Sequence, residues 1–173
     1  MKYTYLSLLA GMLLGFTACD VTNTVPEDAI TDLNYWTKVA DLKQFANSFY
    51  TSLSGPSQWL DDTSDNAVSN SPKDWLFNNA IVPGSGGEWA TSNWANIRNL
   101  NYFLGRYQTV EGDEGEINQY VGEIRFFRAH EYFNKVKTFG DVPWIDKDLT
   151  TADTELLMKA RDPRSFVIDK IIE

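Results

Sequence analysis

The segment from Gly122 to Pro143 constrains the fold of this chain more than any other part of its sequence. A helix drawn through this segment carries apolar side chains on nearly every side, which is typical of a helix buried at the centre of a domain. Gly140 and Pro143 stand at its end, and these residue types terminate helices. The sequence therefore predicts a buried central helix from about residue 116 to residue 139.

Composition indicates a globular domain whose partner is not nucleic acid. The 173 residues are 43% hydrophobic and 14% aromatic, which is enough to bury one core. The net charge of -9 argues against nucleic-acid binding, because phosphate capture requires a basic face. Six tryptophans and eight tyrosines are more than packing alone needs, and exposed aromatic rings bind the apolar faces of sugars.

The N-terminus has the pattern of an export signal. A charged residue, a short apolar stretch over residues 5–16 and small residues lead to Cys19, the only cysteine of the chain. The stretch is shorter than the roughly 20 apolar residues that span a bilayer. Phe16-Thr17-Ala18-Cys19 resembles a lipobox, in which the cysteine thiol receives a diacylglycerol and becomes the new N-terminus. We expect residues 1–18 to be a lipoprotein signal peptide and residues 19–34 to be the lipidated Cys19 and a polar tether; a buried free thiol is the alternative.

Three further helices are predicted from apolar residues spaced three and four positions apart. The first spans residues 37–53, the second spans about 88–107, and the third follows Asp162 and Pro163, which are expected to cap and open it. Residues 54–87 show no period and are rich in Gly, Pro, Ser, Asn and Asp, which predicts a long loop of functional importance. The apolar face of the first helix consists of Val39, Leu42, Phe45, Ala46, Phe49, Tyr50 and Leu53.

Two sequence segments carry a family resemblance. In the central helix, Gly122-Glu123 is followed by Arg125-Phe126-Phe127-Arg128-Ala129, by Tyr132-Phe133 and by Phe139-Gly140-Asp141-Val142-Pro143. This succession resembles the hallmark segment of the SusD/RagB family of nutrient-binding lipoproteins of Bacteroidetes-type bacteria. Residues 94–101, Trp-Ala-Asn-Ile-Arg-Asn-Leu-Asn, resemble the aromatic-x-x-Ile-Arg-x-x-Asn helix of the same family.

The resemblance implies a fold and a function. The implied fold is an all-α helical scaffold with tetratricopeptide-like helix pairs and long ligand-binding loops, and residues 35–173 would be its N-terminal domain, truncated at the C-terminus. The implied protein is a lipid-anchored outer-membrane lipoprotein that faces outward and captures oligosaccharide. It delivers this ligand to a TonB-dependent, SusC-like transporter and needs no cofactor.

Candidate ligand-binding residues lie in the predicted loop. A sugar ring packs on an indole while short polar side chains bond its hydroxyls, so aromatic, acidic and amide residues should be interleaved there. The alternative is that each tryptophan only fastens the loop to the core, which is the reading we prefer for Trp89 and Trp94 on the helical pattern. The candidates are Trp59, Asp61, Asp62, Asn66, Trp75 and Asn78.

The other polar residues favour structural roles. His130 has no nucleophile paired with it in the sequence, and Asp61, Asp62 and Asn66 lack the spacing of a calcium loop, so we expect neither an enzyme nor a metal site. Arg128, Glu131 and Lys135 have the spacing of ion pairs within a helix. Gly122 is expected to allow close packing against a neighbouring helix.

Two rival functions stay open at the level of sequence. The first is a helical scaffold that binds a peptide, another non-glycan nutrient or a protein partner. The second is the beginning of a glycoside hydrolase, for which carboxylate pairs such as Asp61 and Asp62 would serve as acid and base. A chain with 24 acidic residues contains such pairs by chance, so this second signal is weak.

Overall fold

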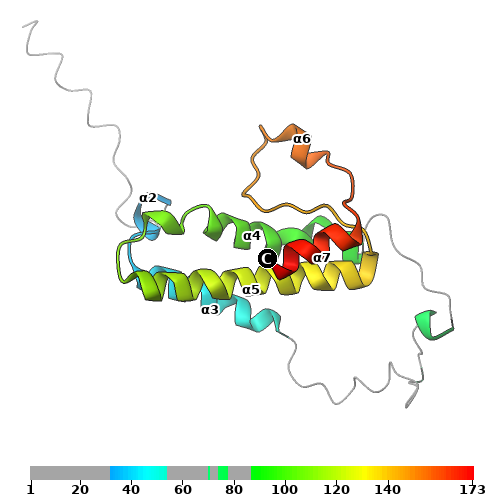
Figure 1. The fold of residues 1–173 in the computed structure, drawn as a ribbon, viewed down its shortest axis with the longest axis horizontal. Helices are drawn as coiled ribbons and strands as arrows, with labels where there is room; N and C mark the ends of the chain where they lie inside the picture. The colour runs from blue at the N-terminus through cyan, green and yellow to red at the C-terminus, as the bar shows by residue number, and fades with distance from the viewer. Residues whose placement is uncertain (1–31, 54–69, 71–73, 78–86) are drawn as a thin grey trace, which may run out of the picture. The chain divides into compact units, whose positions relative to one another are not determined.

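The computed structural model describes residues 32–53, 70, 74–77 and 87–173 (Figure 1). The chain divides into two compact units, Met1–Tyr35 and Trp36–Glu173. The first contributes the short helix α2 (Asp32–Tyr35). The longer helices of the second unit are α3 (Val39–Asn47), α4 (Ala95–Leu104), α5 (Glu114–Phe139) and α7 (Arg164–Ile172).

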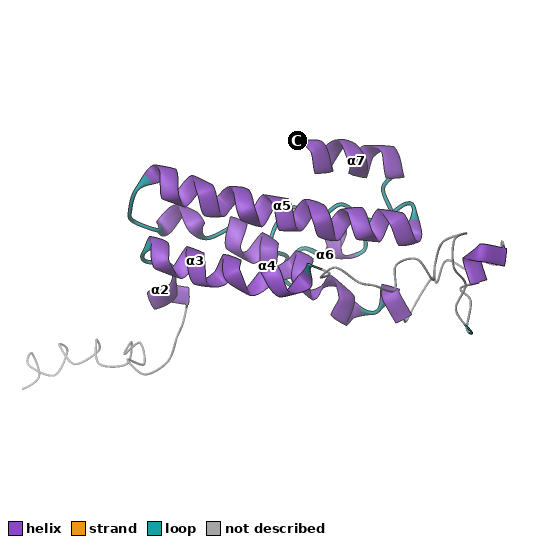
Figure 2. Ribbon diagram, turned by 90° about the horizontal axis from the view of Figure 1, so that it is seen from below, coloured by secondary structure: helices purple, strands orange, loops and turns teal. Residues whose placement is uncertain are grey.

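The described residues contain no β-strand, only two isolated bridges, and the predicted all-α fold is confirmed. None of the helices in the described part of the chain is both long enough and apolar enough to cross a bilayer. Figure 2 shows α3, α4 and α7 lying along the long helix α5.

Helix α5 is the central helix that the sequence predicts. Asp113 caps its start by accepting a hydrogen bond from the Glu116 backbone at 3.0 Å. Its end at Phe139 is followed by Gly140, whose φ of 73° suits glycine. The expectation of burial on all sides is wrong for the described residues, because Phe126 and Phe133 are 57% and 46% exposed.

Helices α4 and α5 form an antiparallel pair, and this is the helical hairpin that the tetratricopeptide-like expectation requires. Asn96 contacts Glu131 and Asn101 contacts Arg128, so residue numbers rise along one helix as they fall along the other. The start of α3 lies close to Gly112, just before α5 begins, and the turn that follows α3 packs on Phe127 within α5. Helix α3 therefore runs parallel to α5.

The predicted helix over residues 37–53 is confirmed, but its second half tightens into a 3₁₀ turn, Ser48–Ser52. The hydroxyls of Ser48 and Ser52 bond carbonyls three residues earlier, at 2.7 and 2.6 Å. Such bonds compete with the i to i-4 pattern and favour the tighter turn. The region 88–107 is likewise α4 flanked by the short 3₁₀ turns Gly87–Trp89, Thr91–Trp94 and Tyr107–Thr109.

Two groups of side chains fill the interior. An aromatic group lies between α3, α4 and α5 and consists of Trp36, Phe45, Phe49, Phe103 and Phe127. The second group lies between α4, α5, α7 and the segment after α5, and consists of Ile97, Tyr132, Val136, Phe139, Val142, Trp144 and Val167. This second core holds together the end of the molecule where the candidate site lies.

The segment between α5 and α7 contains a short helix, α6 (Thr154–Leu157), that the sequence pattern did not predict. The expected cap of α7 is also wrong. Asp162 accepts hydrogen bonds from the Trp144 backbone and from Lys159, while Asp141 accepts the Arg164 backbone N–H at 2.9 Å and so caps the start of α7. A carboxylate from 23 positions earlier in the chain performs this capping role.

Candidate ligand-binding site

The hallmark residues of α5 fasten the segment that follows the helix. The Tyr132 hydroxyl accepts a hydrogen bond from the Ile145 N–H at 2.8 Å and lies 2.9 Å from the Ile145 carbonyl, to which it donates. The same carbonyl accepts the Asn101 amide at 2.8 Å. Because backbone groups near the core need partners, these bonds fix the course of the chain after α5.

Arg128 has a structural role, as predicted, but its partners differ from the expected Glu131. Its guanidinium donates to the Asn101 side chain at 3.0 Å and to the Asp146 carbonyl at 3.3 Å. Burial lowers the pKa of this guanidinium, and the nearby charge of Asp146 opposes that shift. Glu131 instead accepts a hydrogen bond from Asn96 at 2.7 Å.

Gly122 also differs from expectation. A methyl group added at this glycine would meet open space among the described residues, so close packing does not explain it. His130 stacks on Phe126 at 6.4 Å between ring centroids and lies 3.5 Å from the Asn134 amide. These contacts support the structural role expected for this histidine.

All but one of the loop residues predicted to bind ligand lie outside the described residues, as does Cys19. Trp75 is part of a short 3₁₀ helix, Asp74–Phe77, but its side chain is not described. Ligand binding by these loop residues and lipidation of Cys19 therefore stay predictions. The loop residues outside the description are Trp59, Asp61, Asp62, Asn66 and Asn78.

The described chain resumes beyond the loop with a group of aromatic rings. Trp89 lies edge-on against Trp94 and Phe139, with ring centroids 5.1 and 4.7 Å away. Both tryptophans are only partly buried and pack on the second core, so the expectation that they belong to the core is met in part. Each ring retains surface that a ligand can contact.

A polar hollow lies beside these rings, between the start of α4 and the end of α5. We call it the amide hollow; its volume is about 550 Å³. The lining residues are Ser92, Asn93, Asn96, Glu131, Asn134, Lys135, Lys137, Thr138 and Phe139.

Side chains in the amide hollow are already held in place by internal hydrogen bonds. The Asn93 amide donates to the Gly87 carbonyl at 2.9 Å, and the Asn96 amide donates to Glu131 at 2.7 Å. Each bond uses one of the two N–H groups of its amide, and no bond to the amide oxygen of Asn93 or Asn96 is formed within the described residues. Fixed acceptors of this kind suit a ligand rich in hydroxyl groups, because little side-chain entropy is lost on binding.

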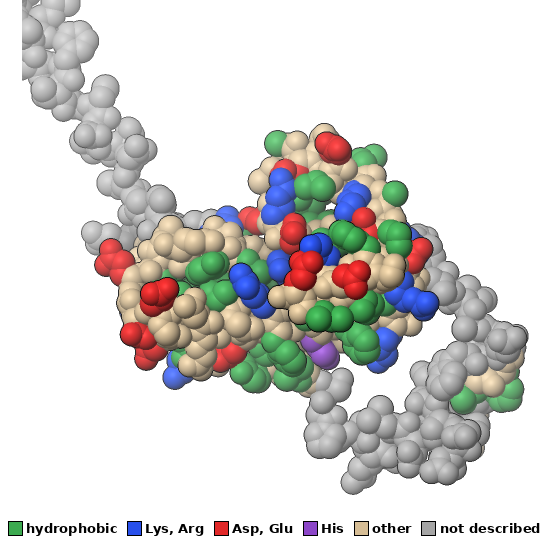
Figure 3. Space-filling model, in the orientation of Figure 1, with side chains coloured by type: hydrophobic (Ala, Val, Ile, Leu, Met, Phe, Trp, Pro, Cys, Tyr) green, Lys and Arg blue, Asp and Glu red, His purple; other side chains and the backbone are tan. Residues whose placement is uncertain are grey.

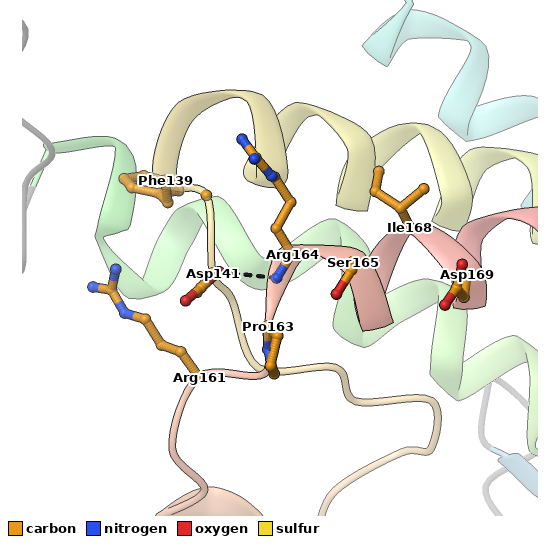
Figure 4. Close-up of a pocket in the computed structure, with 9 residues that line it drawn as sticks. Phe139, Asp141, Arg161, Pro163, Arg164, Ser165, Ile168 and Asp169 are labelled. Atoms are coloured by element: carbon orange, nitrogen blue, oxygen red, sulfur yellow. Dashed lines mark hydrogen bonds between the residues drawn. The ribbon is translucent and has the colours of Figure 1, made fainter.

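A second hollow, the arginine hollow, adjoins the first through Phe139. It has a volume of about 850 Å³ (Figure 4). Figure 4 shows Arg161 and Arg164 extending in different directions from the loop and from the start of α7, with Asp141 bonded to the Arg164 backbone. The lining residues are Phe139, Gly140, Asp141, Arg161, Pro163, Arg164, Ser165, Ile168 and Asp169.

The two hollows, and the aromatic group that meets them at Phe139, form the candidate site. Aromatic faces with amide, carboxylate and guanidinium groups around them can hold a polyhydroxylated ring by stacking and by hydrogen bonds. Sequence reasoning did not select these residues, because Asn93, Asn134 and Arg161 come together only through the folding of three separate segments. In the described part of the chain, no three side chains of the His, Cys, Asp and Glu types gather as a metal site.

Sequence comparison finds a relative for most of the chain. The relative is SusD-like protein P2 of Formosa agariphila, and this chain is 25% identical to it over 178 aligned residues. The alignment covers 93% of this chain and 34% of that protein. No protein-family model matches the chain. The chain thus spans about a third of the length of this relative.

Two solved structures share the fold. A SusD-like protein of Bacteroides fragilis superposes with a TM-score of 0.66 and 27% identity over 86% of this chain and 30% of that chain. A SusD-like carbohydrate-binding protein of the same species matches with a TM-score of 0.58 over 80% of this chain and 30% of that chain. The second match, at 19% identity, bears on the fold alone.

The resemblance read from the hallmark segment is therefore confirmed. The chain is SusD-like in its sequence and in its helical scaffold.

Proposed function

We propose that the protein is a glycan-binding member of the SusD-like class that captures oligosaccharide without cleaving it. The observation that carries this proposal is the pair of partly exposed rings, Trp89 and Trp94, beside the amide hollow. We expect a sugar ring to pack against this aromatic group, which Phe139 joins to the amide hollow, while its hydroxyls bond the amide groups of Asn93 and Asn96. Sequence similarity to SusD-like proteins, at 25% and 27% identity, supports the same class of protein.

The loop before Trp89 is the second part of the proposed binding surface. Residues 54–87 contain Trp59 and Trp75 and lead directly into the aromatic group. We propose that Trp59, Asp61, Asp62, Asn66, Trp75 and Asn78 extend the surface along a longer oligosaccharide.

Isothermal titration calorimetry against a panel of oligosaccharides tests the proposal. Trp89→Ala should weaken binding by roughly 1 to 3 kcal/mol, the scale of one well-used aromatic contact. Because Trp89 also packs on the core, Asn93→Ala provides a milder variant that should weaken binding with little change in melting temperature. Phe126→Ala is the matched control, since this exposed ring lies on α5 outside both hollows.

The calorimetric outcomes separate the two halves of the surface. Loss of binding in Trp59→Ala or Trp75→Ala, with no loss in Trp89→Ala, would place the ligand on the loop alone. Equal binding by wild type, Trp89→Ala and Asn93→Ala would show that the amide hollow does not bind the ligand. A panel without any binder would contradict glycan capture itself.

We further propose that Cys19 anchors the protein by lipid to the outer membrane, facing outward, and that captured glycan passes to a TonB-dependent SusC-like transporter. The lone cysteine at the end of a short apolar segment supports the anchor. Membrane fractionation of cells that express wild type and Cys19→Ala tests it, and a variant that stays membrane-bound to the same extent would exclude the anchor. Co-purification of such a transporter with the tagged protein tests the hand-over.

A scaffold that binds a peptide or another non-glycan nutrient is the second candidate function. The polar lining of the amide hollow can also bond a peptide backbone, because amide and carboxylate groups suit both ligands. This candidate predicts that peptides, and no oligosaccharide, give heat on titration.

A further inference from the structure

Arg161 lies closer to an aromatic ring than the lysines of the candidate site do. Its guanidinium lies 4.1 Å from the centre of the Trp89 ring. Stacking holds the planar group in one orientation and leaves its N–H edge free to donate. No carboxylate of the described residues forms an ion pair with Arg161.

Arg106 shows the same arrangement with an anion bound. Its guanidinium lies 3.4 Å from the centre of the Tyr102 ring and bonds the Asp148 carboxylate at 3.0 Å. A guanidinium held flat on a ring thus binds a carboxylate at its edge elsewhere in this protein. At Arg161 the ring and the guanidinium are present, and a hollow of about 850 Å³ opens beside them.

The charges that line the arginine hollow balance, with Arg161 and Arg164 opposite in sign to Asp141 and Asp169. Asp141 and Asp169 also line the arginine hollow, but Asp141 already accepts the Arg164 backbone N–H at the start of α7. Arg164 adds a second cation to the same lining. In the face drawn in Figure 3, acidic side chains gather at the end where α5 begins, and basic and acidic side chains are interspersed over the other half.

From this geometry we infer that Arg161, held on Trp89, binds an anionic group of the glycan, a carboxylate or a sulfate. The inference rests on the proposed glycan binding and assigns the substrate class to acidic saccharides. In this arrangement the amide groups of the amide hollow bond the neutral hydroxyls of the glycan, and Arg161 bonds its carboxylate or sulfate. Charge-assisted bonds to a guanidinium are about twice as strong as neutral ones, so the acidic group should contribute strongly to affinity.

The test is calorimetry with three sets of oligosaccharides of matched length: neutral xylo- and cello-oligosaccharides, oligogalacturonates, and sulfated galactan oligosaccharides. Wild type is compared with Arg161→Gln, Arg161→Lys and the control Arg98→Gln, which removes an exposed arginine of α4 outside both hollows. The tightest ligand should be an acidic one, and the galacturonate and sulfated sets show which anion is preferred.

Arg161→Gln should weaken the acidic ligand by roughly tenfold or more, and Arg161→Lys should fall between, because an ammonium lacks the planar fork. Arg98→Gln should bind as wild type does. The inference is overturned if neutral ligands bind tightest, if Arg161→Gln binds acidic ligands as wild type does, or if it weakens neutral and acidic ligands equally. The first two results leave glycan binding intact, whereas a panel without binders ends both proposals.

Discussion

The Tyr132 hydroxyl bonds both backbone groups of Ile145, accepting its N–H at 2.8 Å and donating to its carbonyl at 2.9 Å. One side chain of α5 thereby completes the hydrogen bonding of a residue 13 positions later. Burial raises the pKa of this hydroxyl well above its usual range, so it keeps its proton throughout neutral conditions. The bond pair links the end of the long helix to the segment that leads to Arg161.

Replacement of Tyr132 by phenylalanine should destabilise the protein by about 1 to 3 kcal/mol, because it leaves the two Ile145 groups without this partner. Urea denaturation measures the change. Tyr50→Phe is the matched control, since the Tyr50 hydroxyl bonds Glu123 at 3.2 Å on an exposed surface. Equal stability of Tyr132→Phe and wild type would contradict the role of this hydroxyl.

Asn101 and Tyr132 should act as one unit. Both donate to the Ile145 carbonyl, and Asn101 also accepts from Arg128. A double-mutant cycle of Asn101→Ala and Tyr132→Phe should therefore show a coupling energy of roughly 0.5 to 3 kcal/mol. Additive effects within experimental error would show that the two side chains hold the segment independently.

Gly122→Ala should stabilise the protein by about 0.5 to 1 kcal/mol, because alanine favours the helix and its methyl group meets open space. Gly140→Ala is the paired variant and should destabilise, since the φ of 73° strains a residue with a Cβ atom. Thermal unfolding of both proteins measures the difference. A lower melting temperature for Gly122→Ala would reveal a packing partner at this helix position.

Acid should weaken the segment around α6. Hydrogen bonds from Lys147 and Thr150 lower the pKa of Asp153 from 3.8 to about 2. Because the folded pKa is the lower one, the contribution is present above pH 3.8 and is lost as pH falls toward 2. The free energy of unfolding should thus fall less steeply with acid in Asp153→Asn than in wild type.

Glu155→Gln is the control for that pH series, because its exposed side chain bonds no other described residue. Urea denaturation at steps between about pH 5 and pH 2 gives the slopes. Identical slopes for wild type and Asp153→Asn would show that this carboxylate does not contribute.

The helices could be predicted because their signals are local. Apolar spacing placed α3, α4, α5 and α7, and Gly140 marked the end of α5, since glycine adopts the required backbone conformation. The 3₁₀ turn after α3 was missed because apolar spacing does not distinguish a short 3₁₀ turn from a continued α-helix, and the serine hydroxyl bonds that favour the turn leave that spacing unchanged.

The features that the sequence did not predict depend on contacts between distant segments. The partner of Arg128 is Asn101, 27 positions earlier, and spacing along one helix cannot indicate it. The cap of α7 comes from Asp141 for the same reason. The candidate site was missed because Trp89 and Arg161, and likewise Asn93 and Asn134, come together only in the folded chain.

The central claim is that glycan binds at the end of the helical domain where Trp89 lies. Hydrogen–deuterium exchange of the protein, with and without the oligosaccharide that binds tightest in the calorimetric panel, tests this most directly. The account predicts slower amide exchange over residues 87–97, at the last turns of α5 and in the 161–165 segment. The start of α5, around Glu114, should exchange at an unchanged rate. Protection confined to other parts of the chain, with these segments unaffected, would contradict the account.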